Sequence, residues 1–112
     1  MPSKHESVFA AIDQNFRQAA ENYYRDQIAH PSAQERAAIR KNLKDAEDAY
    51  NKAAMLKLGS SGDALDAAFA NLTAANKEIE NARASAKKID NFAALLKQAT
   101  AFAGIIVKIA AL

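Results

Sequence analysis

Cysteine and tryptophan are absent from this sequence, and glycine and proline are scarce, with three and two residues. Without cysteine the chain has no disulfide framework, no thiolate nucleophile and no cysteine-based zinc site. So few glycines and prolines provide too few turns for a β-sandwich or a β-barrel. Three glycines are also too few for the glycine-rich loop that cradles a phosphate group.

Alanine is abundant instead, at 28 of the 112 residues. It is the strongest helix former because it loses no side-chain entropy when a helix forms. A chain of this length is enough for one domain but not for two. We therefore expect residues 1–112 to form a single all-α domain, an alanine-rich helical bundle.

Two breaks divide the chain into three expected helices, over residues 4–29, 33–58 and 63–111. The first helix is expected to end at His30-Pro31, because the residue before a proline avoids the α region. Ser32 with Glu35 three residues later is typical of a helix N-terminus, where the hydroxyl accepts from the third backbone N–H. A Gly-Ser-Ser-Gly segment ends the second helix, and Asp63 is expected to cap the third.

The third expected helix carries a seven-residue apolar repeat. One heptad position holds Leu65, Leu72, Ile79, Ala86 and Ala93, and the other holds Ala68, Ala75, Ala82, Ile89 and Leu96. A repeat sustained this long favours coiled-coil packing against a partner helix. We therefore predict an antiparallel helical bundle of three helices, in which the third helix is long and either straight or kinked.

The alternative is a compact up-down four-helix bundle with a break near residues 89–91. Lys87 and Lys88 suit the C-terminus of a helix, where the macrodipole favours positive charge. Asp90 and Asn91 suit the N-cap of a new helix. The absence of glycine and proline here, and the unbroken heptad register, favour the continuous helix over this alternative.

Residues 92–112 carry apolar side chains over an unusually wide face. At 100° per residue these side chains spread over about 220°, whereas a surface helix needs about 100°. The large ones are Phe92, Leu95, Leu96, Phe102, Ile105, Ile106 and Ile109. Lys97 and Lys108 share nearly one bearing, with Thr100 and Gly104 beside them, so they form a narrow polar stripe at the border.

Such a face has three interpretations. It belongs to the central helix of a compact bundle, or it binds a second copy or another helical protein, or it lies on an anionic membrane surface. The uncharged stretch between Lys97 and Lys108 is too short to span a bilayer, which needs about 20 residues. We expect the seven large apolar residues to be an interaction surface for protein–protein interaction or self-assembly, with both lysines at its rim. Membrane association through the same segment is the alternative.

No constellation of residues in the sequence predicts catalysis, a metal or a cofactor. His5 and His30 are the only histidines, and neither has a second ligand at metal-binding spacing. Glu78 and Glu80 are two residues apart and face different sides of a helix. We therefore expect a protein that is not an enzyme and that has no cofactor.

The charge pattern argues against a nucleic-acid partner. The net charge is only +2, from 15 basic and 13 acidic residues. Arg36, Arg40 and Lys44 form a basic ridge, but acidic residues surround it and no aromatic residues interleave for base stacking. The first residues contain no apolar signal-peptide run, so we expect a cytoplasmic protein, with a membrane-peripheral location as the alternative.

Overall fold

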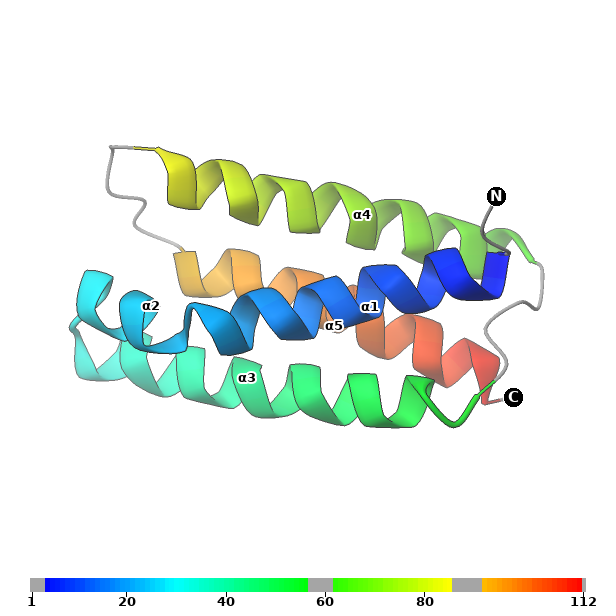
Figure 1. Ribbon diagram of the computed structural model, residues 1–112, viewed down its shortest axis with the longest axis horizontal. Coiled ribbons are helices and arrows are strands. Elements are labelled where there is room, and N and C mark those ends of the chain that lie inside the picture. The colour runs from blue at the N-terminus through cyan, green and yellow to red at the C-terminus, as the bar shows by residue number, and fades with distance from the viewer. Residues whose placement is uncertain (1–3, 57–61, 86–91, 112) are drawn as a thin grey trace.

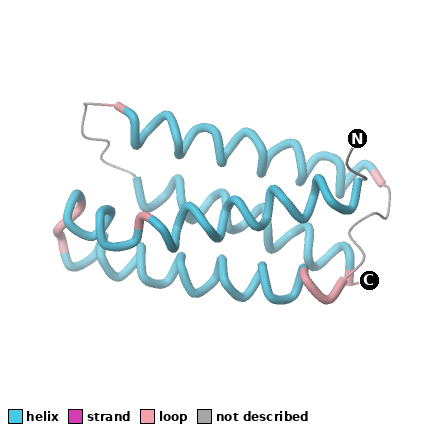
Figure 2. Tube along the Cα trace, in the orientation of Figure 1, coloured by secondary structure: helices cyan, strands magenta, loops and turns pink. Residues whose placement is uncertain are grey.

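The computed structural model describes residues 4–56, 62–85 and 92–111, and every regular element within these ranges is an α-helix (Figure 2). The helices are α1 (Lys4–Glu21), α2 (Tyr23–Ala29), α3 (Ala33–Ala53), α4 (Asp63–Ala84) and α5 (Phe92–Ala110). The all-α class predicted from the alanine content is confirmed.

The helices lie side by side as four rods, with α1 and α2 end to end in one of them (Figure 1). The molecule measures 40 × 23 × 21 Å, which is one helix length by about two helix widths. Helix α5 packs against α4, α3 and α1, and α1 packs against both α3 and α4. Within the described ranges no Cα atom of α3 lies within 8 Å of a Cα atom of α4. Figure 1 shows that the neighbours α3 and α5 run in the same direction.

The helix expected over residues 4–29 is divided at Asn22, which separates α1 from α2. The side-chain Nδ2 of Asn22 donates to the Gln18 carbonyl oxygen at 2.8 Å, and the backbone N–H of Asn22 donates to the same oxygen at 3.2 Å. An asparagine side chain that competes for a backbone carbonyl disturbs a helix locally. The sequence analysis did not predict this division, because the segment around Asn22 contains neither proline nor glycine.

The single helix predicted over residues 63–111 is wrong. Helix α4 ends at Ala84, Ser85 has an extended backbone with φ −73° and ψ 137°, and α5 begins at Phe92 as a separate helix. Helices α1 and α3 have only 18 and 21 residues, so a straight continuation of α4 would extend past both of them. Packing α5 back against α4 covers its apolar side chains instead. The break expected near residues 89–91 lies outside the described residues.

Two further boundary predictions have different outcomes. Ser32 caps α3, since its Oγ accepts from the Glu35 N–H at 3.1 Å, as the sequence predicted. Asp63 is not an N-cap but the first residue of α4, and Gly62 precedes it without a side-chain cap. Helix α3 ends at Ala53, and the predicted end at residue 58 lies outside the described residues.

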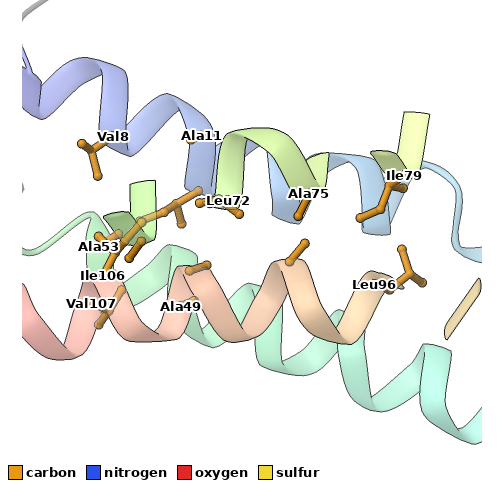
Figure 3. Close-up of a cluster of buried hydrophobic side chains, with 14 of the residues drawn as sticks. Val8, Ala11, Ala49, Ala53, Leu72, Ala75, Ile79, Leu96, Ile106 and Val107 are labelled. Carbon is orange, nitrogen blue, oxygen red and sulfur yellow. The ribbon is translucent and has the colours of Figure 1, made fainter. Parts of the chain in front are cut away.

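The core lies between the four rods and is built from small and branched side chains (Figure 3). Leu65, Leu72 and Ile79 of α4 are buried against Leu96 and Ile106 of α5 in one cluster. Buried alanines come from all four rods: Ala11 and Ala19 in α1, Ala46, Ala49 and Ala53 in α3, Ala68 and Ala75 in α4, and Ala93, Ala99 and Ala103 in α5. Their small side chains let the helix axes approach closely, which positions the surface described next.

Candidate functional site

The structure divides the seven predicted interaction residues into three groups by burial. Phe92, Leu96 and Ile106 are at most 3 % exposed and belong to the core. Leu95, Phe102 and Ile109 are partly buried against that core. Ile105 alone of the seven is exposed, at 44 %.

The predicted surface therefore needs a correction: Phe92, Leu96 and Ile106 offer no area to a partner. The physical reason is that α5 contacts three other helices and uses most of its wide apolar face on them. Three neighbouring helices thus cover most of the apolar face of α5. The accessible part of α5 includes Ile105 and the exposed residues on the side next to α3.

A groove of about 830 Å³ lies between α3 and α5, on this accessible side. Its α3 wall carries Lys41, Asp45, Asp48 and Lys52, which are spaced four, three and four residues apart. These intervals place all four side chains on one face of the helix. The wall thus has a base at each end and two acids in the middle, over about 16 Å of helix axis.

The α5 wall of the same groove repeats this spacing with different chemistry. Lys97, Ala101, Gly104 and Lys108 are again four, three and four residues apart. Lysines stand at both ends, while the middle has almost no side chain. A Cβ added at Gly104 would meet no heavy atom within 4 Å, so the backbone is open to the groove there.

Asn42 and Thr100 join the two walls beneath the groove. The Thr100 hydroxyl donates to Asn42 Oδ1 at 2.6 Å and accepts from Asn15 Nδ2 of α1 at 3.2 Å. Because α3 and α5 are parallel, this bond places Lys41 beside Lys97 at one end and Lys52 beside Lys108 at the other. Asn42 lines the groove, is only 4 % exposed, and its Nδ2 has no hydrogen-bond partner.

The groove carries an excess of positive charge. Lys41 forms an ion pair with Asp45, with 2.7 Å between Nζ and Oδ2. Lys52, Lys97 and Lys108 line the groove without an ion pair to any described residue. Four lysines against two aspartates leave a net charge of +2 along the groove, which favours an anionic occupant.

A second cavity, of about 580 Å³, lies between α4 and the rod formed by α1 and α2. Two of its arginines already have carboxylate partners, since Arg17 pairs with Asp13 and Arg83 pairs with Asp26. Among the described residues no three His, Cys, Asp or Glu side chains come together in a way that would hold a metal ion. The groove between α3 and α5 is therefore the stronger candidate for a binding site.

Comparison with known proteins finds no match: no family model, no curated protein and no solved structure is similar to this chain. By length and composition, α5 is the one helix of the described ranges that is apolar enough to cross a membrane. The core helix of a soluble protein meets the same criterion, and 44 % of the apolar stretch of α5 is buried within the molecule.

Sequence reasoning located half of the groove. It placed Lys97, Thr100, Gly104 and Lys108 on one polar stripe, and all four residues line the groove. It missed the α3 wall, because lysines and aspartates at intervals of three and four are typical of any solvated helix. The shared spacing of four, three and four on two separate helices was the available signal.

Proposed function

We propose that this chain is a non-enzymatic helical bundle whose α3–α5 groove binds a helix presented by a partner protein. The observation that carries the proposal is the pair of matching walls, with lysines at both ends and small residues between them. Recognition of an amphipathic helix in a groove is a recurring mode of protein–protein interaction.

The shape and charge of the groove define the helix that fits it. Ala101 and Gly104 add almost no bulk to the α5 wall, so a helix with a small-residue face can approach closely. Acidic side chains about eleven residues apart would reach the lysines at both ends, which are separated by about 16 Å.

The proposal is tested with a synthetic helical peptide that has an alanine face bordered by glutamates eleven residues apart. Fluorescence anisotropy measures its binding to the chain, and the same peptide with lysines in place of the glutamates is the control. We expect the glutamate peptide to bind and the lysine peptide not to bind. Equal binding of both peptides, or of neither, would contradict the proposal.

Matched variants of α5 locate the binding. Gly104→Leu places a side chain in the groove, where an added Cβ meets no heavy atom within 4 Å. Ala94→Leu places the same leucine side chain at an exposed α5 position that does not line the groove. We expect Gly104→Leu to weaken binding of the glutamate peptide at least tenfold and Ala94→Leu to leave it unchanged.

Membrane association through α5 is the second candidate function, and the apolar character of α5 supports it. Ile105 is exposed, Phe102 and Ile109 are partly exposed, and Lys97 and Lys108 stand to one side of them. Such an arrangement suits a helix that lies on anionic lipid. Co-sedimentation with anionic and with neutral liposomes tests this candidate, and an absence of binding to both rules it out.

A further inference from the structure

The order of charges along the α3–α5 groove is the same from either end. Along α3 the order is base, acid, acid, base, and the intervals of four, three and four residues are symmetric. Along α5 the lysines at 97 and 108 stand at the two ends, beside those of α3. This symmetry restricts which partner helix can use the whole groove.

A symmetric dimer formed groove to groove is disfavoured by this pattern. When two copies of the groove face each other over their full length, lysines meet lysines at the ends. The lysines meet lysines in both parallel and antiparallel docking, whereas the aspartates meet aspartates only in antiparallel docking, because parallel docking places α3 of one copy over α5 of the other. Like charges placed directly opposite each other oppose association. The occupant must therefore be a different surface.

The outward side of α4 has the complementary properties. Ala67, Ala70 and Ala74 form an exposed strip of small residues along it. Exposed Asp66 and Glu78 lie on the two sides of this strip, twelve residues or about 18 Å apart along the axis. This separation is close to the 16 Å between the lysine ends of the groove. Asp66 Oδ1 pairs with Lys4 of α1, and the Asp66 side chain remains 56 % exposed.

The remaining charges of α4 also suit the groove. Exposed Asp63 adds negative charge near one end of the same side, whereas Glu80 lies at the edge toward α1 and accepts from Gln14 Nε2. Lys77 is the one exposed base of α4, and it lies next to Glu78. When Glu78 contacts the lysines at one end of the groove, Lys77 is within reach of Asp45 and Asp48 in the middle of the α3 wall. The order of charges on α4 thus opposes the order in the groove.

We infer that the groove binds the outward side of α4 from a second copy of this chain. The inference rests on the proposed function and names the partner helix. Within the described ranges no Cα atoms of α3 and α4 lie within 8 Å of each other, and α1 and α5 separate the two helices (Figure 1). One copy therefore uses its groove and its α4 surface at the same time, and head-to-tail contacts of this kind extend into an open assembly.

Sedimentation equilibrium over a range of concentrations at low salt tests this inference. We expect the average mass of the wild-type chain to increase beyond that of a dimer with concentration, and to fall at high salt, where the charges are screened. A chain that stays monomeric, or that stops at a dimer, overturns the inference.

Charge reversal identifies the two surfaces. The groove variant carries Lys97→Glu and Lys108→Glu, and the α4 variant carries Asp66→Lys and Glu78→Lys. Each variant alone opposes like charges, so we expect its self-association to be at least tenfold weaker. A 1:1 mixture pairs each altered surface with a complementary one, and we expect it to assemble as the wild type does.

A control variant with Arg40→Glu and Lys44→Glu makes the same change of charge on exposed α3 residues that do not line the groove. We expect it to assemble like the wild type. Wild-type-like assembly of either single-surface variant, or failure of the mixture to assemble, overturns the inference. Binding of the glutamate peptide by a monomeric wild-type chain would retain the proposed function and reject only the second copy as partner.

Discussion

Arg83 of α4 and Asp26 of α2 form a two-point ion pair near the end of the molecule where α2 lies. The guanidinium donates from Nε to Oδ1 at 3.2 Å and from Nη2 to Oδ2 at 2.5 Å, and the two side chains are only 11 % and 5 % exposed. Arg83 also donates to Gln18 and stands 5.2 Å from the centre of the Phe92 ring. His30 stacks on the same ring at 4.8 Å. These contacts attach the short helix α2 to α4 and to the first residue of α5.

Removal of the Asp26 carboxylate should destabilise the fold strongly. Asp26→Ala leaves the Arg83 guanidinium buried without its counter-ion, and breaking a buried pair on one side costs about 3–5 kcal/mol. The control is Asp13→Ala, which removes an exposed pair with Arg17 and should cost about 1 kcal/mol or less. Urea unfolding followed by circular dichroism measures both, and equal costs would show that the buried pair has no special weight.

The Thr100 hydroxyl should stabilise the contact between α1, α3 and α5. Thr100→Val keeps the volume but leaves Asn15 Nδ2 and Asn42 Oδ1 without partners, at about 1–3 kcal/mol for each group. Thr73→Val is the matched control, because Thr73 is exposed and its hydroxyl bonds only to the Phe69 carbonyl of its own helix. The control should change the free energy of unfolding by about 0.5 kcal/mol or less. A Thr100→Val protein as stable as the control would show that water satisfies the two amides.

Two adjacent isoleucines of α5 should respond very differently to truncation. Ile106 is fully buried, so Ile106→Ala should lower the free energy of unfolding by about 2–5 kcal/mol. Ile105 is 44 % exposed, so Ile105→Ala should lower it by about 1 kcal/mol or less. Thermal unfolding monitored by calorimetry gives both values. A large cost at Ile105 would show that this side chain is covered in solution by a contact other than the proposed one between the groove and α4.

Gly104 should be replaceable by alanine with a gain in stability. It lies in the interior of α5, where glycine is about 0.8–1.0 kcal/mol less favourable than alanine. The added Cβ meets no heavy atom within 4 Å, so no steric cost offsets this gain. Gly104→Ala should therefore raise the melting temperature. A lower melting temperature would indicate that another segment covers this part of the groove.

The heptad repeat predicted the buried face of α4 correctly. Leu65, Leu72 and Ile79 are at most 1 % exposed, and Ala68 and Ala75 beside them are buried. The same repeat misled about the continuation of the helix. Its period is the same in two helices that each pack in a bundle, so an unbroken register does not require an unbroken helix. The division between α4 and α5 depends on which helices bury the apolar side chains of α5. This is a tertiary effect that no local sequence pattern contains.

The groove depends on a second property that a single sequence does not contain, namely the relative placement of α3 and α5. The bond between Asn42 and Thr100 sets their register across 58 positions of the chain. Before that pairing is known, Lys41 and Lys52 are two solvated lysines among several on α3. The α5 wall was accessible to prediction because its polar stripe stands out on an otherwise apolar helix.

The position of α5 between α3 and α4 has a consequence for the order of folding. During synthesis the chain up to residue 84 contains α1 to α4, but no Cα atom of α3 lies within 8 Å of one of α4 in the described structure. Before α5 is present, both can dock only on the rod formed by α1 and α2, so the apolar sides that α5 will cover remain open to water. The cooperative core thus cannot close until α5 has left the ribosome, and until then those sides are available to chaperones or to other growing chains.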